Sequence, residues 1–288
     1  GWGMTGDVAV PGDYTGNGTA NYAVFRPSDG RWYIRPDGGG SPIIHAFGSA
    51  TDILVPGDYD GDGRTDLAVI QRNTFTWRIR RSSDGLMTEI QFGGDGDIPV
   101  PGDYNQDGML EPAVFRPELA TWFHHTATGR AAVAWGSAGD IPCPGDYDGD
   151  GFTDRAVFAP GTATWSVRPS GGGADTATAW GSTGDRPVPG DYDGDGRTDI
   201  ALYRAGSREW RIRKSSDGTM LSLPPVFFGW GAALDCPVPA DFESGTGSAN
   251  VAVYRASSGT WYIRNLTSGV TQEPMGTAGD IPVAGDYD

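Results

Sequence analysis

Short runs of apolar and β-branched residues recur along the whole chain. Gly, Asn, Asp and Ser separate these runs, as the tight turns between antiparallel strands require. Within residues 49–93 the pattern predicts four strands, over Ile53–Asp58, Asp66–Gln71, Thr76–Arg80 and Glu89–Phe92. No segment shows a convincing helical period of apolar positions. We therefore expect an all-β protein.

The strand pattern repeats about every 45 residues and is marked by the tripeptide Gly-Asp-Tyr or a close variant. The Asp of this tripeptide stands at 13, 58, 103, 146, 191, 241 and 286, and a Trp follows at 32, 77, 122, 165, 210 and 261. Four strands in ~40–45 residues is the length of one propeller blade. The pattern predicts a single β-propeller domain over residues 1–288, in which neighbouring blades cover each other's faces.

The repeats divide the chain into six full units and the opening of a seventh. The full units are 4–48, 49–93, 94–136, 137–181, 182–231 and 232–276, and residues 277–288 form the partial one. In a closed ring of six blades, the strand expected over Ile281–Asp286 has no place, because Val8–Asp13 already fills it. We expect six or seven blades and slightly favour seven. In that case the sequence is part of a longer chain, or a strand from a partner completes the last blade and allows self-assembly.

Acidic residues are concentrated in the loop that follows the first strand of each unit. Three loops carry Asp at positions one, three, five and nine, with glycines that permit a tight turn and a backbone carbonyl at position seven. Ca²⁺ takes about six to eight oxygen ligands, so this spacing predicts calcium sites. The candidate ligands are Asp58, Asp60, Asp62, Arg64 (carbonyl) and Asp66; Asp146, Asp148, Asp150, Phe152 (carbonyl) and Asp154; and Asp191, Asp193, Asp195, Arg197 (carbonyl) and Asp199.

The other loops depart from this full pattern. The third unit offers Asp103, Asn105, Asp107, the Met109 carbonyl and Glu111, and we expect a fourth Ca²⁺ there with one carboxylate fewer. The loop of the first unit keeps a single carboxylate, so it predicts a weak site at best. The loop of the sixth unit contains an inserted residue, and we expect no metal in it.

The chain has a formal net charge of −16, with 37 acidic and 21 basic residues. Much of this acidity belongs to the candidate metal loops. The balance argues against a nucleic-acid partner, which requires patches of Lys and Arg. No apolar run approaches the ~18–20 residues that a membrane-spanning helix needs.

A second periodic pair of charges lies outside the loops. A leading Asp stands six residues before the Asp of each Gly-Asp-Tyr. Arg recurs at the end of the second strand, at 26, 116, 204 and 255, and three residues after the Trp, at 35, 80, 168, 213 and 264. We favour structural pairing between the leading Asp of a neighbouring unit and one of these Arg sets over a ring of Arg that grips an acidic ligand. The repeated Trp is interpreted as core between blades.

These features resemble the FG-GAP/VCBS repeats of the integrin-alpha-type β-propeller over nearly the whole chain. The resemblance rests on the three full Asp-x-Asp-x-Asp-Gly-x-x-Asp loops, the Phe-Gly and Trp-Gly pairs, and Phe-Arg-Pro-Ser-x-Gly-x-Trp-Tyr at 25–33. In that family the calcium loop joins the first two strands of a blade on one rim. The resemblance thus implies calcium at the loops that begin at Asp58, Asp103, Asp146 and Asp191. Family members include adhesion proteins, lectins and modules of polysaccharide-degrading enzymes.

The sequence therefore predicts a calcium-stabilised, secreted or cell-surface propeller that acts as an adhesion or structural module, through protein binding or self-assembly. The alternative is a carbohydrate-binding, lectin-type propeller with sugar sites in the clefts between blades. An accessory module or fragment of a polysaccharide-degrading enzyme ranks third. We expect no catalysis, because His45, His124 and His125 stand in no recognisable triad or metal-ligand pattern.

Overall fold

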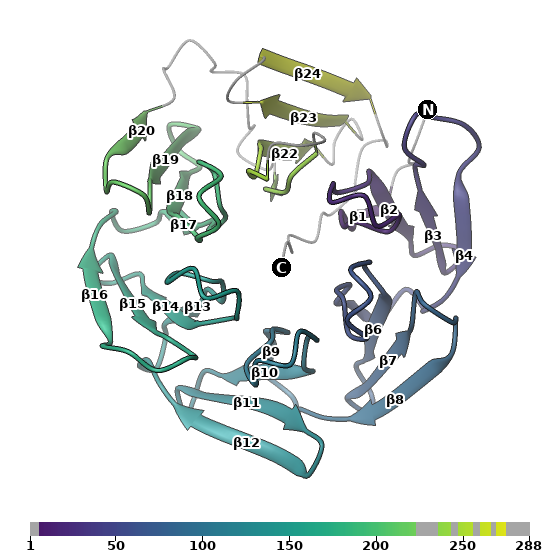
Figure 1. Ribbon diagram of the computed structural model, residues 1–288, viewed down its shortest axis with the longest axis horizontal. Helices are drawn as coiled ribbons and strands as arrows, with labels where there is room; N and C mark the ends of the chain where they lie inside the picture. Colours follow the sequence, from purple (N-terminus) through teal and green to yellow (C-terminus); the bar gives the residue numbers. More distant parts are fainter. Residues whose placement is uncertain (1–5, 223–235, 243–246, 256–259, 266–268, 275–288) are drawn as a thin grey trace.

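The computed structural model shows six four-stranded sheets arranged as blades around a central axis (Figure 1). It describes residues 6–222, 236–242, 247–255, 260–265 and 269–274. Five consecutive blades run from β1 to β20, and the sheet β21–β24 stands between the fifth blade and the first. Within these described ranges every element is a strand, and no helix long and apolar enough to cross a bilayer occurs.

The second strand of each blade is mostly buried, whereas the short innermost strand is partly exposed in the third, fourth and fifth blades. The innermost strands are β1 (Val8–Ala9), β5 (Ile53–Leu54), β9 (Ile98–Pro99), β13 (Ile141–Pro142), β17 (Arg186–Pro187) and β21 (Cys236–Pro237). The second strands are β2 (Ala23–Arg26), β6 (Leu67–Gln71), β10 (Ala113–Arg116), β14 (Arg155–Ala159), β18 (Ile200–Arg204) and β22 (Val251–Arg255). The innermost strand of the second blade ends at Leu54, before the predicted Asp58, although pairing with the second strand continues through the Val55 N–H and an isolated bridge between Gly57 and Asp66.

The two outer strands of each blade lead from the core to the solvent. The third strands are β3 (Arg31–Ile34), β7 (Thr76–Arg80), β11 (Thr121–Thr126), β15 (Thr164–Arg168), β19 (Glu209–Arg213) and β23 (Thr260–Asn265). The outermost strands are β4 (Ile43–Ala46), β8 (Met87–Gln91), β12 (Gly129–Ala134), β16 (Thr176–Ala179), β20 (Met220–Ser222) and β24 (Gly269–Pro274). Burial alternates along β7, as expected for a strand with one core face, whereas β8 is almost wholly exposed.

The repeated Trp of the third strand is buried in every blade, with exposures from 0% to 4%, which confirms its interpretation as core. The Tyr of Gly-Asp-Tyr packs against it. In the second blade the ring centroids of Tyr59 and Trp77 are 6.4 Å apart, and the Tyr59 hydroxyl donates to the Val55 carbonyl at 2.7 Å. The first, third and fifth blades repeat this arrangement. The Tyr thus fixes the start of the acidic loop to the core.

A closed circle of backbone hydrogen bonds joins the blades around the axis. In each bond the N–H of loop position eight, or its counterpart, donates to the carbonyl of the loop-opening Asp in the preceding blade. The donors and acceptors, 2.5 to 2.9 Å apart, are Thr65 and Asp13, Leu110 and Asp58, Thr153 and Asp103, Thr198 and Asp146, Ala249 and Asp191, and Ala20 and Asp241. The last of these bonds links the sheet β21–β24 to the first blade, where Tyr22 also packs against Phe242.

This circle corrects the blade number. The sequence slightly favours seven blades over six, and that expectation is wrong. The described sheets already satisfy every inter-blade bond of the circle, so no gap between them admits a further blade. A count of strand beginnings along the sequence does not include this closure, which depends on contacts between the two ends of the chain. Residues 277–288, where the sequence predicts the start of a seventh unit, lie outside the described residues.

In the first four blades the glycine before the loop-opening Asp lies very close to the neighbouring blade. A Cβ built on Gly145 would lie 2.6 Å from Oγ1 of Thr198, the residue at loop position eight of the next blade. In the sheet β21–β24 this glycine is replaced by Ala240, and the residue that donates across the junction is the small Ala20. At these two junctions the residue before the loop-opening Asp and the position-eight residue of the next blade are thus Gly with Thr and Ala with Ala. Both combinations fit the short distance between the two blades.

Candidate metal centres

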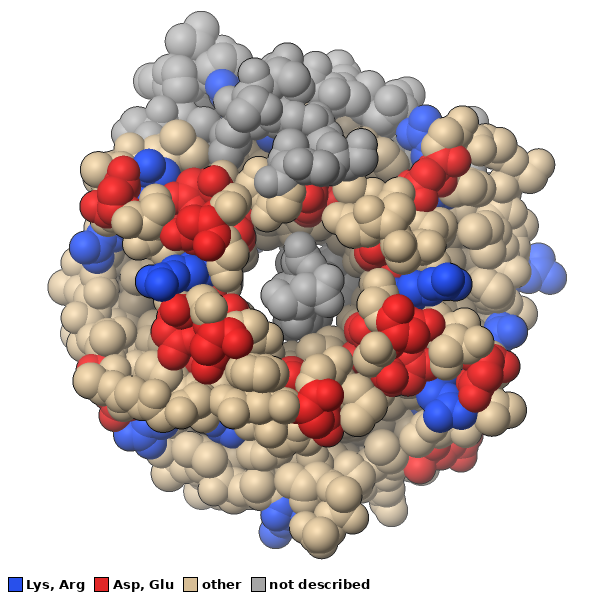
Figure 2. Space-filling model, in the orientation of Figure 1, with Lys and Arg blue, Asp and Glu red and all other residues tan. Residues whose placement is uncertain are grey.

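The loops between the first and second strands bring the predicted ligands together in four groups. Figure 2 shows acidic side chains gathered around the central opening on the face in view. In each group, carboxylate oxygens from three residues lie within 4.8 Å of one another. The groups are Asp58, Asp60 and Asp62; Asp103, Asp107 and Glu111; Asp146, Asp148 and Asp154; and Asp191, Asp193 and Asp199. They fall in the four loops for which the sequence predicts calcium.

The opening Asp of each loop holds the backbone of the turn. Asp191 Oδ1 accepts a hydrogen bond from the Gly194 N–H at 2.7 Å, and Oδ2 accepts one from the Gly196 N–H at 2.8 Å. These glycines have φ angles of 76° and 82°, which residues with a Cβ adopt only with strain. Asp58 and Asp146 make the same pair of bonds in their loops. The chain itself therefore preforms the turn that places the other carboxylates.

The carboxylate at loop position nine lies deepest. Asp66, Asp154 and Asp199 have no exposed surface, and each accepts hydrogen bonds from two backbone N–H groups. Burial raises the pKa of Asp66 to about 7 and the pKa values of Asp154 and Asp199 to about 6. Glu111 takes this position in the third loop, and burial raises its pKa to about 7. The two backbone N–H donors lower the pKa of these carboxylates less than burial raises it. A bound cation would therefore stabilise their ionised form.

Position three carries oxygens that lack any partner. Asp60 Oδ1 and Asp193 Oδ1 are buried, and neither has a hydrogen-bond partner among the described residues. A buried acceptor without a partner is costly, and carboxylates this close together repel one another. A hard divalent cation would remove both costs, because it would coordinate the unpartnered oxygen and neutralise the repelling carboxylates. The donor set, which consists of carboxylate, amide and carbonyl oxygens with no nitrogen or sulfur ligand, fits Ca²⁺.

Position five differs from loop to loop. Asp62 and Asp107 belong to the tight groups, whereas Asp150 and Asp195 lie outside them. Asp66 is also outside the tight group of its own loop, although it is buried beneath it. Asn105, a predicted ligand at position three, donates through its amide to Asp107 and Glu111.

The residue at loop position seven was predicted to bind calcium through its backbone carbonyl. Its side chain points away from its own loop. Arg64, Met109 and Arg197 extend over the position-four residue of the preceding loop, where a Cβ on Gly16, Gly61 or Gly149 would lie 2.7 to 3.0 Å from them. Phe152, like Arg197, lines the central cavity of about 680 Å³. Neighbouring loops therefore touch through these side chains as well as through the backbone circle.

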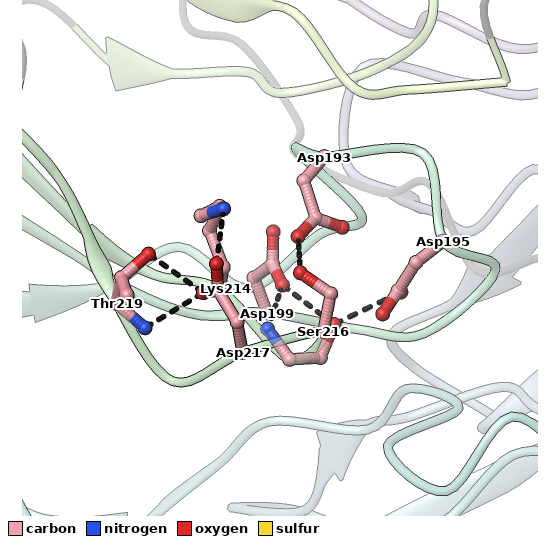
Figure 3. A network of polar contacts seen from close by, with 8 residues as sticks. Asp193, Asp195, Asp199, Lys214, Ser216, Asp217 and Thr219 are labelled. Atoms are coloured by element: carbon pink, nitrogen blue, oxygen red, sulfur yellow. Dashed lines mark hydrogen bonds and ion pairs between the residues drawn. The ribbon is translucent and has the colours of Figure 1, made fainter.

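The sequence analysis missed a second segment of the site, the turn between the third and fourth strands. In the fifth blade the Ser215 hydroxyl donates to Asp195 and Asp199 at 2.9 and 2.8 Å, and the Ser216 hydroxyl donates to Asp193 at 2.5 Å (Figure 3). In the second blade, Ser82 and Ser83 donate to Asp62 and Asp60 in the same way. The signal was available, because the tetrapeptide Ser-Ser-Asp-Gly occurs at both 82–85 and 215–218.

The first loop replaces carboxylates with hydrogen-bonded neutral groups. Asn21 stands at position nine, accepts a bond from the Tyr14 N–H at 2.8 Å and donates to Asp37 at 2.9 Å. The Thr15 hydroxyl donates to the other carboxylate oxygen of Asp37, which comes from the turn between β3 and β4. This loop is not among the acidic groups of the described residues. Asp37 was not identified from the sequence, because the same turn position carries Ser82, Ser170 and Ser215 in other units and an acid only here.

Three leading Asp residues pair with Arg of their own unit, not of a neighbouring unit as the sequence was interpreted. The bidentate pairs are Asp7 with Arg26, Asp97 with Arg116, and Asp185 with Arg204, with N···O distances of 2.7 to 2.8 Å. The first and second strands are antiparallel, so the residue that precedes one lies beside the end of the other. These Asp side chains are at most 3% exposed, and the pairs are structural.

Comparison with known proteins adds a family and a fold. The profile of the FG-GAP-like repeat matches residues 58–114 and 146–202, and a search of curated proteins found no match. Virginiamycin B lyase from Staphylococcus aureus has a similar structure, with a TM-score of 0.57 and 8% identity over 94% of this chain and 85% of that chain. BBS1N in complex with ARL6DN is also similar, with a TM-score of 0.54 and 12% identity over 95% of this chain and 83% of that one.

At these identities the solved structures show the fold alone. The family matches are more specific, because each begins at a loop-opening Asp of an acidic loop and runs into a second strand of the following unit. Each match covers the second to fourth strands of one blade and the start of the next blade, and all six sheets share the same strand order and inter-blade bonds. The chain is therefore a β-propeller that contains FG-GAP-like repeats at residues 58–114 and 146–202.

Proposed function

We propose that this chain is a calcium-stabilised extracellular β-propeller that serves as a protein-interaction module. The FG-GAP propeller fold supports a protein-interaction role in general. One observation carries the calcium part of the proposal. In the loops of the second and fifth blades, a buried carboxylate oxygen without a partner lies within a group of close carboxylates.

The residues of each loop have distinct tasks in this proposal. The opening Asp holds the turn, and the side chain at position three supplies further oxygens, joined in the second and third loops by the carboxylate at position five. The buried carboxylate at position nine lies deepest. Bound Ca²⁺ would neutralise these groups and thereby hold each loop against its neighbour. The third loop is proposed to bind through Asp103, Asp107 and Glu111, with Asn105 reoriented so that its amide oxygen faces inward.

An extracellular setting fits loops of this kind. Calcium sites of extracellular modules have dissociation constants of about 10⁻⁴–10⁻³ M, which the calcium outside cells saturates and the cytosol does not. We accordingly propose a secreted or cell-surface location. We also propose that the chain has no catalytic activity. Two of its three His are poor proton acceptors, because burial and Arg155 lower the pKa of His124 to about 4, and burial also lowers the pKa of His45.

The test is thermal unfolding in calcium and in excess chelator. A site at a hundredfold excess of ligand over its Kd adds about 2.7 kcal/mol, and about 1 kcal/mol moves Tm by roughly 2–4 °C in a domain of this size. With several sites we expect chelation to lower Tm by at least about 10 °C, and Mg²⁺ to restore little of it. Equal melting temperatures in calcium and in chelator would contradict the proposal.

Carbohydrate binding is the second candidate. It is supported by half-buried aromatic rings at the blade junctions, Trp135 and Trp180, which a sugar ring could contact. Arg168 and Arg211 of the following blades, however, already stand over these rings, at 4.1 and 5.4 Å from their centroids. The Trp residues of the third strands are core residues and offer no platform. A glycan array of the calcium-loaded protein tests this candidate. Calcium-dependent binding to one sugar class would make carbohydrate binding the preferred function.

A further inference from the structure

Three blades share a buried ion pair that the second and fourth blades lack, since their second strands end in Gln71 and Ala159. In the fifth blade, Arg204 bonds both oxygens of the leading Asp185, at 2.7 and 2.8 Å, and also donates to the Ser182 hydroxyl at 3.0 Å. In the fourth blade the equivalent acidic residue is Asp140 and the equivalent hydroxyl belongs to Ser137, but the second strand ends in Ala159 instead of Arg. The fourth blade therefore keeps the carboxylate and the hydroxyl but has no Arg at the end of its second strand to bond them.

Asp140 has no cationic partner in the described part of the chain. Its carboxylate accepts one hydrogen bond, from the Ser137 N–H at 2.8 Å. The nearby Arg168 is already engaged, because it bonds both oxygens of Asp175 at 3.0 and 2.7 Å while its guanidinium lies over Trp135. The Asp140 carboxylate is therefore a charge for which the described residues supply no counterion.

A cavity of about 360 Å³ opens at this place, and we call it the Asp140 cleft. It lies between the third and fourth blades, and its lining includes Leu119, Trp135, Ser137, Asp140 and Ser166. Ser166 is the residue after the core Trp of its blade. At the same position other blades carry Tyr33, Arg78, Phe123 or Arg211. Two small residues, Ala159 and Ser166, thus stand where other blades have bulky or cationic groups.

The chemistry of the cleft matches one kind of group. A carboxylate beside a hydroxyl reproduces the surroundings that hold the Arg204 guanidinium in the next blade, and an indole ring and a Leu side chain form the remaining wall. A guanidinium is planar, bonds a carboxylate with two parallel N–H groups and stacks on aromatic rings. An ammonium group makes a point contact instead, and a neutral polar ligand leaves the carboxylate without a counterion.

We propose that the Asp140 cleft receives an arginine side chain of a partner protein, which completes the ion pair that Arg26, Arg116 and Arg204 supply from within the chain in other blades. This inference rests on the proposed role as a protein-interaction module and names the chemistry of its partner. The formal net charge of −16, which four bound Ca²⁺ would reduce to −8, favours approach of a basic segment.

The test uses N-acetyl-L-arginine amide as a probe in an NMR titration of the ¹⁵N-labelled, calcium-loaded protein. We expect saturable shifts that include the indole N–H of Trp135. The neutral isostere N-acetyl-citrulline amide should bind at least about tenfold more weakly, as should the probe to the Asp140→Asn variant. Asp52→Asn is the matched control, because Asp52 is the leading Asp of the second blade and lies outside the cleft lining. It should leave the probe affinity unchanged.

A second variant fills the cleft from within. Ala159→Arg should restore the ion pair with Asp140, raise Tm and abolish probe binding. The proposal is overturned if the wild-type protein shows no saturable shift, if citrulline binds as well as arginine, or if Asp140→Asn and Ala159→Arg bind the probe like the wild type. None of these readouts depends on the melting temperature difference between calcium and chelator, so failure of the cleft and failure of the calcium proposal are separately visible.

Discussion

The first and fifth blades contain the same loop with different chemistry inside it. Both loops open with Asp, bond the same backbone N–H groups and end in a buried side chain that accepts a Tyr N–H. In the fifth blade the interior holds Asp193 and Asp199 close together, with burial raising the pKa of Asp199 to about 6. In the first blade it holds Thr15 and Asn21, both bonded to Asp37.

This comparison separates the scaffold of the loop from its charge. The turn, the closing bridge to the second strand and the bond to the neighbouring blade occur with four carboxylates and with one. Clustered carboxylates are therefore not needed to build the loop. They add repulsion and buried charge, a disadvantage in the absence of a cation, so their retention in several consecutive loops is best explained by cation binding.

Converting the fifth loop to the composition of the first should give the largest effect. The variant Asp193→Thr, Asp195→Asn, Asp199→Asn should bind one Ca²⁺ fewer by isothermal titration calorimetry. Its stabilisation by calcium should fall by about 2–3 kcal/mol at a hundredfold excess over Kd. In chelator it should be at least as stable as the wild type, because the buried charge is gone. An unchanged stoichiometry would mean that the fifth loop is not a calcium site.

The shared scaffold can be broken without touching any carboxylate. Gly145→Ala places a methyl group 2.6 Å from Thr198 Oγ1 and should cost about 1–3 kcal/mol in urea unfolding. Adding Thr198→Ala imitates the Ala240 and Ala20 pair and should recover most of this loss. A double variant as unstable as Gly145→Ala alone would show that the contact with Thr198 is not the reason for the glycine.

The comparison also predicts a pH dependence. The chelated protein should become less stable as pH rises from about 4 to about 7, because the folded state holds protons on Asp66, Asp154, Asp199 and Glu111 that the unfolded state releases near pH 4. Calcium binding competes with these protons, so the gain in Tm from calcium should be larger at pH 7.5 than at pH 5. A gain that is constant over this range would exclude a role for these carboxylates.

Much of this architecture is predictable from the sequence, because each blade repeats its own local rules. The acidic loops, the core Trp and the strand order all follow from patterns within one unit. The failures concern contacts between segments. The blade number depends on the bond between Ala20 and Asp241 at the two ends of the chain, and Asp37 reaches the first loop from a different turn. The pairing of Asp185 with Arg204 follows from strand direction, which a search for periodic charges does not include.

The smallest effect should come from the serine turn over the fifth loop. Ser215→Ala removes hydroxyl bonds to Asp195 and Asp199 but keeps the backbone N–H bond to Asp199. If these bonds orient the carboxylates for a cation, the variant should bind calcium about threefold to tenfold more weakly at one site. Site-resolved affinities from calorimetry of the loop variants measure this change.

The fourth blade supplies the matched control for this serine. Ser170 occupies the same turn position and gives the same backbone bond, to Asp154, but its hydroxyl has no partner among the described residues. Ser170→Ala should therefore leave calcium affinity unchanged, although it removes the same atoms. Equal losses in the two variants would mean that truncation of the turn, and not orientation of the carboxylates by a hydroxyl, lowers the affinity. A loss confined to Ser215→Ala would show that loops with the same carboxylates are tuned by a segment that the loop motif does not contain.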